Sequence, residues 1–590
     1  MSKNIPKTSD PGISRNRSHI GTVGENEMLS VRRLINLMTA VVLVAALFIS
    51  FSVTGSRKNQ YDFEQKISIE PDWIQAAEIR EGKPWNFILV ASNSREECEI
   101  ANNLEGYLNK TKADFSRVDN IASIEKFRPE RDVLVFCTTP LGEVCDLRDV
   151  ESYVRSGGKI ILAAGLPQGY DDAYLWPLLG IREKGIMEQC SSFTTQEGLL
   201  PLKMEHLNFE EFNNCTRFAP DPSIQIYMEE VEKKTPILYS RNIDEGCIGV
   251  VNSSILEYES CSGWFAALFA QMVQTSVVPA LGIRSLILDS YPVNMVISDD
   301  QSMEAYGMNF EAFLVTEFLP AIQRISTSYS LPVICSADMA VDQDDGFVSN
   351  IRNQFETVSF ETLRFGSELV FGAYLTQDGK TMRVNDSLLE LFEEVLPSYI
   401  VCTLNSTGPI QFEEDPSERL KIHRVIAKSE EWKDGQIPVL SEGIDIEESR
   451  MFEIAANLAG FGGLIHRVNC SQMFLQNGSD NWDRSMKQLE SFNRDVLSAT
   501  NWLVGVGSEQ AELAVQSYQN MNYTWSVSDD GLHIRASGLL KGQPFLVKTS
   551  NTIAEVEGAT MQILDGGYYL IQMQENEAIL HWNEADSFDA

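Results

Sequence analysis

The sequence predicts a membrane-anchored α/β protein with three folded domains beyond the membrane. An uncharged apolar run fills residues 34–53, strand-like and helix-like segments alternate from residue 85 onward, and short strands with glycine turns follow near the end. These observations predict the following parts: a cytoplasmic tail 1–33, a transmembrane helix 34–53, a linker 54–84, a doubly wound α/β domain 85–281, a distorted β/α barrel 282–520 and a small β-sandwich 521–590.

The run from Leu34 to Val53 is long enough to cross the hydrocarbon core of a bilayer as a helix. Arg32 and Arg33 stand directly before it, so the positive-inside rule places the N-terminus in the cytoplasm. The stretch 52–56 is a poor cleavage site, which favours an uncleaved signal anchor over a cleaved signal peptide. We therefore expect a single-pass protein of the plasma membrane with its large C-terminal part outside the cell.

Acidic residues dominate the composition, with 84 Asp and Glu against 47 Lys and Arg and a net charge of -37. The tail 1–33 has six basic and three acidic residues, and removing its charge of +3 leaves -40 on residues 34–590. Such a charge excludes nucleic acid and anionic lipid as partners. Two interpretations remain open: a solvated surface that keeps an exported protein soluble, and attraction to a cationic partner such as a polymer of amino sugars.

The ten cysteines show no Cys-x-x-Cys pair and no spacing typical of a zinc site. Several lie in apolar runs, where cysteine usually acts as a small buried side chain. We expect at most one or two disulfides, and the candidates are Cys190, Cys215, Cys247 and Cys261.

The first domain alternates strands and helices in the manner of a parallel sheet covered by helices. Strands are expected at 87–91, 132–136 and 159–164, with helices at 95–108 and 147–156. With the turn Ser156-Gly157-Gly158-Lys159 before its third strand, the segment resembles the glutamine-amidotransferase-like fold. In active members of that family a nucleophile follows a central strand. Here that turn reads Ala-Ala-Gly-Leu-Pro at 163–167, which predicts a non-catalytic, structural or ligand-sensing module.

Apolar runs recur through residues 282–520, separated in several places by helix-length amphipathic segments, and this repetition is typical of a β/α barrel. One run closes on Asp299 and Asp300. Ile297-Ser298-Asp299-Asp300 resembles the opening motif of the polysaccharide deacetylases. The resemblance implies that Asp299 is a general base and Asp300 a metal ligand, because metal-bound water must lose a proton as it attacks an amide.

The second deacetylase motif, which carries two metal-binding histidines, resembles residues 366–376. Glu368 falls in register with that motif, but Gly372 and Thr376 stand where the histidines are expected. Without imidazole ligands the site would hold a transition metal poorly. The late histidine of the family corresponds to His466, for which a metal-binding role and a structural role stay equally open. We expect no cofactor, with a divalent metal as the alternative.

Asp338 follows the second strand of the expected barrel, on the side where barrels keep their active sites. Further acids follow it at 342, 344 and 345, and such oxygens suit a hard cation, although the spacing is not that of an EF-hand. A solvated acidic loop is the alternative interpretation. Asp338 and Glu368 are also candidates for binding the substrate.

The order of parts resembles a family of bacterial membrane-anchored proteins with a divergent polysaccharide-deacetylase barrel, found in exopolysaccharide systems that include Pel-type loci. That resemblance implies a degenerate barrel that binds or guides an amino-sugar polymer together with polysaccharide synthesis and export proteins of the membrane. The rival hypotheses are an active polysaccharide N-deacetylase with an unorthodox metal site, and an ectodomain that only contacts proteins of an export complex.

Overall fold

We describe a computed structural model of the chain. Residues 71–590 form one compact unit. The structure describes residues 72–74, 84–91, 98–167, 171–201, 206–209, 211–289, 299–339, 368–373, 382–384, 400–403, 410–412, 420–426, 432, 436–443, 448–470, 473 and 479–583. None of the described helices has both the length and the apolar character needed to cross a bilayer. The predicted transmembrane run 34–53 lies outside the described residues.

The first sheet has nine strands in the order β3-β2-β4-β5-β12-β11-β10-β7-β8. The strands from β3 to β12 pair in parallel, whereas β11, β10, β7 and β8 extend the sheet in antiparallel fashion. The expectation of an all-parallel sheet is therefore wrong for this second half. The bounds are β2 (Asn86–Val90), β3 (Asp114–Val118), β4 (Asp132–Phe136), β5 (Lys159–Leu162), β7 (Ser192–Thr195), β8 (His206–Asn208), β10 (Gln225–Glu230), β11 (Pro236–Ile243) and β12 (Gly246–Val251).

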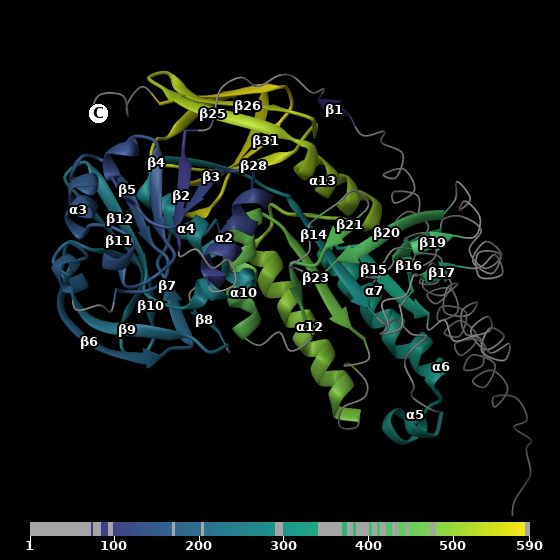
Figure 1. Cartoon of the computed structure of the whole chain (residues 1–590). Coiled ribbons are helices and arrows are strands. Elements are labelled where there is room, and N and C mark those ends of the chain that lie inside the picture. The colour runs from purple at the N-terminus through teal and green to yellow at the C-terminus, as the bar shows by residue number, and fades with distance from the viewer. Residues whose placement is uncertain are drawn as a thin grey trace, which may run out of the picture. The chain divides into compact units, whose positions relative to one another are not determined.

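Helices cover both faces of this sheet (Figure 1), because alternate residues of each strand point to opposite layers. In β4, Val133 and Val135 belong to one core, and Leu134 and Phe136 belong to the other. The first core includes α2 (Glu99–Lys110) and α4 (Gly263–Met272), and the second includes α3 (Leu147–Arg155). A separate ribbon joins β6 (Ile181–Gln189) to β9 (Asn214–Pro220).

The second sheet runs in the order β21-β20-β18-β16-β15-β14-β23-β22, with β24 (Val504–Gly505) also paired to β14. Every strand pair in it is parallel. The two end strands of this order are neighbours in the chain, and Leu440 between them donates its N–H to the carbonyl of Ile465 at 2.9 Å. The bounds are β14 (Ile283–Asp289), β15 (Val333–Met339), β16 (Glu368–Ala373), β18 (Ile400–Thr403), β20 (Leu420–Ile426), β21 (Gln436–Pro438), β22 (Ser441–Glu442) and β23 (Leu464–Asn469).

Helices accompany the second sheet along its length. A continuous helical segment passes from α6 through a π-helical turn (Leu314–Phe318) into α7, and two short strands, β17 and β19, pair with each other. The bounds are α5 (Asp299–Tyr306), α6 (Phe310–Phe313), α7 (Leu319–Tyr329), β17 (Met382–Val384), β19 (Ile410–Phe412), α10 (Glu448–Phe461), α12 (Ser479–Ala499) and α13 (Ser508–Asn520).

The C-terminal region contains two antiparallel four-stranded sheets, ordered β25-β26-β32-β29 and β13-β28-β31-β30. The second includes β13, so the expected boundary at 281 separates a strand from the sheet to which it belongs. The short β1 also pairs with β27. The bounds are β1 (Trp73–Ile74), β13 (Thr275–Pro279), β25 (Asn522–Ser528), β26 (Gly531–Ser537), β27 (Leu539–Leu540), β28 (Pro544–Thr549), β29 (Ile553–Glu557), β30 (Ala559–Ile563), β31 (Tyr568–Met573) and β32 (Glu577–Trp582).

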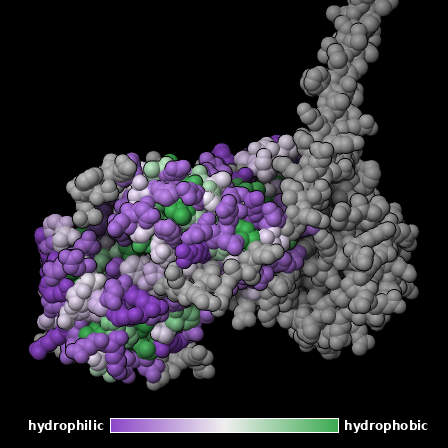
Figure 2. Space-filling model, turned by 90° about the horizontal axis from the view of Figure 1, so that it is seen from above, coloured by the Kyte–Doolittle hydropathy of each residue, from purple (hydrophilic) through white to green (hydrophobic). Residues whose placement is uncertain are grey.

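Close packing of α4 on α10 joins the two large sheets. A Cβ atom added at Gly263 would lie 1.7 Å from the carbonyl oxygen of Ala456, so only glycine allows this approach. Tyr107 of α2 donates a hydrogen bond to the carbonyl of Gly460 at 3.2 Å. One continuous apolar core therefore extends through both sheets and the C-terminal strands. On the face seen in Figure 2 the described surface is mainly hydrophilic, with small apolar areas between polar ones.

Candidate functional site

The carboxyl ends of the parallel strands in the second sheet are the place where such a sheet usually binds ligands. The strand register sets four residues side by side there: Asp338 pairs with Gly372, Gly372 with Thr403, and Thr403 with His423. Because these residues are register partners, they lie at one level of the sheet on β15, β16, β18 and β20. Neighbouring strands are about 4.8 Å apart. We call these four residues the carboxyl-edge row.

Of the two residues predicted to bind the substrate, Asp338 lies in the carboxyl-edge row and Glu368 does not. Asp338 belongs to it, but Glu368 begins β16 and pairs with Ile334. Ile334 precedes Asp338 by four residues, which corresponds to about 13 Å along a strand. The structure thus separates the two residues that were expected to bind the same substrate. For both of them it describes the backbone only.

Two members of the row bear on whether it could bind a metal or a substrate: Gly372 and His423. Gly372 is the position at which the resemblance to the polysaccharide deacetylases predicts a metal-binding histidine, and it stands directly between Asp338 and Thr403. Sequence reasoning overlooked His423 because residues 420–426 were not recognised as a strand. The available signal was the pattern Leu-Lys-Ile-His-Arg-Val-Ile, in which a rare histidine lies among aliphatic residues.

Asp299 and Asp300 lie elsewhere than expected. They begin α5 and do not end a strand, since β14 ends at Asp289. Acidic residues in the first turn of a helix are stabilised by the partial positive charge of the helix N-terminus. Asp300 is exposed to solvent. The position at the helix N-terminus therefore explains two acidic residues here without a catalytic role. Residues 290–298, which connect the pair to β14, lie outside the described residues.

His466 lies inside β23 and its side chain is only 1% exposed. Its Nδ1 is 2.8 Å from Oγ of Ser441, and its Nε2 is 3.1 Å from the carbonyl oxygen of Gly443. A neutral ring with its proton on Nε2 satisfies both contacts, because Nε2 donates to the carbonyl and Nδ1 accepts from the hydroxyl. The ring also packs against Phe492, with centroids 4.7 Å apart.

This environment uses both nitrogens of His466. A histidine that binds a metal needs one nitrogen with a free lone pair, and its other N–H usually holds a supporting acceptor. His466 instead ties β23 to β22, with which it pairs in register. Within the residues that the structure describes, no group of three or more His, Cys, Asp or Glu side chains could hold a metal ion. The side chains of Asp299, Asp338 and Glu368 are outside that set.

The first sheet offers no nucleophile in the turn that follows β5. The turn 163–167 contains Gly165 with φ +82°, and Leu166 is buried beneath it. Burial raises the pKa of the Cys137 thiol well above its usual value, so this cysteine is a poor nucleophile. The four cysteines considered for disulfides are all buried and form no disulfide: Cys190, Cys215, Cys247 and Cys261.

Comparison with known proteins identifies one family. The sequence profile described as "Uncharacterised protein conserved in bacteria (DUF2194)" matches residues 59–358. No curated protein matches the chain.

Similar solved structures include a beta-galactosidase from Bacillus circulans sp. alkalophilus, with 14% identity over 33% of this chain and 34% of that one at a TM-score of 0.24. An exo-beta-1,4-mannosidase from an Opitutaceae bacterium is 15% identical over 32% of this chain and 36% of that one, at 0.23. A calcium-binding mutant of Bacteroides uniformis beta-glucuronidase 2 is 10% identical over 68% and 54%, at 0.18. The chain spans about a third of the first two, and TM-scores this low carry no argument about its fold or activity.

Proposed function

The chain belongs to the bacterial DUF2194 family, and from that premise we propose that it is a membrane-anchored, catalytically degenerate binding protein for an extracellular amino-sugar polysaccharide. It would hold or guide the polymer beside membrane proteins that make and export it, in an exopolysaccharide system such as one of Pel type. Its barrel would derive from a polysaccharide deacetylase that has lost its metal site.

The strand order of the second sheet supports the barrel. Residues 436–442 pair with β20 at one end and with β23 at the other, and all the pairs between these strands are parallel. A parallel sheet whose two end strands are continuous in the chain closes on itself in the manner of a β/α barrel. The ligand-binding side of such a barrel is the side that carries the carboxyl-edge row.

The state of the histidines is the observation that carries the proposal. Both ring nitrogens of His466 are hydrogen-bonded, one to the hydroxyl of Ser441 and one to the carbonyl of Gly443. Gly372, at the centre of the carboxyl-edge row, has no side chain that could bind a metal. Loss of two imidazole ligands removes most of the affinity for zinc and similar ions. A deacetylase without its metal lacks the group that activates water, so the barrel is left with binding.

The acidic composition supports a cationic ligand. Residues 34–590 carry a net charge of -40, and a polymer of partly deacetylated hexosamines bears ammonium groups. Opposite charges accelerate encounter and hold a flexible polymer near the surface. Because exposed charges are screened over about 8 Å at physiological ionic strength, this attraction weakens as salt is added.

The rival function is an active N-deacetylase with an unorthodox site built from Asp299, Asp300, His466 and Asp338. The carboxyl-edge row contains Asp338 from this set, and His423 lies three strand spacings away from it, about 14 Å across the sheet. A protein-interaction ectodomain is the third candidate function. Binding of an isolated oligosaccharide separates this third candidate from the first two.

We therefore expect the purified full-length protein to bind a glucosamine hexamer more tightly than an N-acetylglucosamine hexamer, and the difference should shrink as sodium chloride is raised. Isothermal titration at low, physiological and high salt measures both effects. A cellohexaose titration controls for neutral polar binding. Equal affinity for all three hexamers at every salt concentration, or no affinity for any of them, would remove the proposal.

A further inference from the structure

Two cysteines meet at one end of the ribbon formed by β6 and β9. Cys190 is the first residue after β6, and Cys215 is the second residue of β9. Both side chains are buried, with 4% and 2% of their surface exposed, and both are in the thiol form. The sequence leaves the pairing of the four candidate cysteines open, so the arrangement of these two thiols bears directly on that question.

The register of the ribbon brings both thiols to the same face. β6 pairs antiparallel with β9, and Gln189 stands opposite Asn214. The N–H of Cys190 donates to the carbonyl of Asn213 at 3.0 Å. Cys190 is therefore the diagonal neighbour of Cys215, since side chains two residues apart on a strand point to the same side. A hydrogen bond links the two thiols across the ribbon.

Asn213 holds the sulfur atom of Cys190 in this position. The side chain of Asn213 is fully buried, and its Nδ2 donates to both the carbonyl oxygen and Sγ of Cys190, each at 3.3 Å. Its Oδ1 accepts from Oγ of Ser253 at 2.6 Å and from the N–H of Ser254 at 3.1 Å. The amide group therefore fixes Cys190 relative to the segment that follows β12.

A second pair of nearby cysteines in the first sheet is arranged differently. Sγ of Cys98 donates to the backbone carbonyl of Cys137 at 3.2 Å, and Sγ of Cys137 donates to that of Val135 at 3.7 Å. Each of these thiols is thus directed to the backbone. In Cys190 and Cys215 the thiols are directed to each other, which is the arrangement that a disulfide requires.

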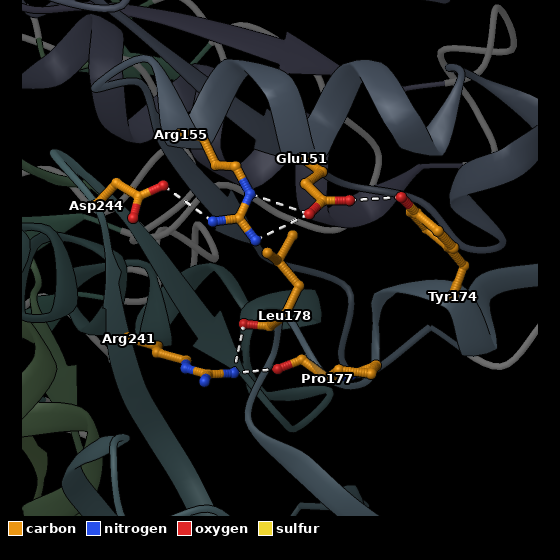
Figure 3. A network of polar contacts seen from close by, with 7 residues as sticks. All are labelled: Glu151, Arg155, Tyr174, Pro177, Leu178, Arg241 and Asp244. Atoms are coloured by element: carbon orange, nitrogen blue, oxygen red, sulfur yellow. Dashed lines mark hydrogen bonds and ion pairs between the residues drawn. The ribbon is translucent and has the colours of Figure 1, made fainter.

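The opposite end of the ribbon is fastened to the first sheet by polar contacts. Arg241 of β11 donates to the carbonyl oxygens of Pro177 and Leu178, the latter at 3.2 Å, shortly before β6 begins (Figure 3). Directly after β9, the N–H of Asp221 donates to the carbonyl of Gly180 at 2.8 Å. A covalent link between the two cysteines would fasten the remaining end.

We propose that Cys190 and Cys215 form a disulfide bond that closes this end of the ribbon when the chain folds under oxidising conditions. The proposal goes beyond the proposed function and does not depend on polysaccharide binding. Disulfides persist outside the cytoplasm, where the expected membrane topology places the first sheet. Diagonal neighbours lie about 7–8 Å apart at Cα and a disulfide spans about 4.4–6.8 Å, so the bond draws the end of β6 toward β9 by about 1 Å.

The oxidant is an external disulfide such as glutathione disulfide. One cysteine attacks it as a thiolate, forms a mixed disulfide and releases one thiolate of the reagent. The second cysteine loses its proton to solvent and displaces the other half of the reagent, so the protein loses two electrons and two protons and the reagent becomes two thiols. The hydrogen bond to Cys215, followed by burial, raises the pKa of the Cys190 thiol. We therefore expect slow exchange in the folded protein and faster exchange during folding.

The test is peptide mapping of the full-length protein, synthesised in detergent micelles in a glutathione redox buffer so that the thiols meet the oxidant before they are buried. Free thiols are blocked, and the protein is digested without reductant. Mass spectrometry should detect a peptide linked through Cys190 and Cys215 that disappears on reduction, and Cys215→Ala should abolish it. Cys247→Ala is the matched control: this buried thiol is hydrogen-bonded to Ser240, and its loss should leave the linked peptide unchanged.

Thermal unfolding measures the effect of the bond on the fold. Because a bond that closes the loop 190–215 restricts the unfolded chain, reduction should lower the unfolding midpoint by several degrees, and Cys215→Ala should lack this shift. Recovery of both cysteines as blocked thiols from protein that unfolds cooperatively overturns the proposal. Linkage of either cysteine to a different partner overturns it as well.

Discussion

The two large sheets place their polar groups differently. In the first sheet, Asp132 at the start of β4 is buried and paired by the protein itself: it accepts from Nδ2 of Asn86 at 2.9 Å and from the N–H of Arg128 at 2.8 Å. In the second sheet, His466 follows the same rule, whereas Asp338 and His423 share the carboxyl-edge row. The pairing of Asp132 and His466 fits a structural role, whereas Asp338 and His423 remain candidates for a binding site because parallel strands usually bind ligands at their carboxyl ends.

The junction between the two sheets allows the largest expected effect. Gly263→Ala should destabilise the fold by about 3 kcal/mol, because its Cβ would meet the carbonyl of Ala456 and force α4 away from α10. Gly106→Ala in α2 is the matched control: a Cβ there meets nothing within 4 Å. That control should stabilise by about 1 kcal/mol, since alanine is the better helix former. Urea unfolding monitored by circular dichroism measures both.

A loss of stability in both glycine variants would contradict the account of the junction. It would mean that the effect reflects the first sheet as a whole and not the contact between α4 and α10.

The comparison between strand interior and carboxyl edge is sharpened by two histidines of the second sheet. His466→Ala should cost about 2–4 kcal/mol of stability, because it leaves a cavity and an unsatisfied hydroxyl on Ser441. His423→Ala should instead weaken hexamer binding with a smaller change in unfolding midpoint. Chemical denaturation and titration of the same two variants provide the measurement. The distinction fails if His423→Ala is the more destabilising change, or if His466→Ala loses binding while its stability is retained.

Ser441→Ala is a milder version of the first change. It should cost about 1–3 kcal/mol, because Nδ1 of the buried imidazole loses its donor. In the double variant with His466→Ala the two costs should be less than additive, because both changes remove the same hydrogen bond.

The smallest expected effect is a pH dependence at the contact between the first sheet and α13. Lys112 donates to the carbonyls of Gln519 and Met521, the latter at 2.7 Å, and burial lowers its pKa to about 8. Above that value the folded state loses this proton, while the unfolded state keeps it until about pH 10.4. The unfolded state then binds more protons, so the free energy of unfolding contributed by this group rises from pH 8 to 10.

A Lys112→Met variant isolates that contribution, because methionine fills similar space without titrating. The free energy of unfolding of the unmodified protein minus that of the variant should increase across this window. A constant difference would contradict this account by showing that Lys112 has the same pKa in both states, and a falling difference would contradict it by showing a pKa raised in the folded protein.

The extent to which sequence predicts this fold depends on the range of the interaction. Local patterns predicted β4 at its full bounds and placed α3 within one residue, because a run of aliphatic residues or a helical period needs no distant partner. The antiparallel half of the first sheet and the inclusion of β13 in a C-terminal sheet were not predicted. The pairing of β13 with β28 joins segments far apart in the chain, which local periodicity cannot reveal. By contrast, β10, β11 and β12 follow one another through short turns, and no strands were predicted there.

The candidate site shows the same limit. Asp338 was recognised from the sequence because it follows an apolar run, but its neighbours depend on the register of three strand pairs. A shift of one residue in a strand would replace Gly372 and His423 by residues that face the opposite side of the sheet. Likewise, nothing in the sequence near His466 indicates that Ser441 and Gly443 would occupy both of its nitrogens.

The most direct test of the central claim is to measure bound zinc and released acetate on the full-length protein incubated with an N-acetylglucosamine hexamer. The account predicts less than stoichiometric zinc and no acetate above a heat-treated control, from the same preparation that binds the glucosamine hexamer. Stoichiometric zinc or acetate release would contradict it. Acetate release that disappears in Asp338→Asn and in His423→Ala would further identify the carboxyl-edge row as an active deacetylase site.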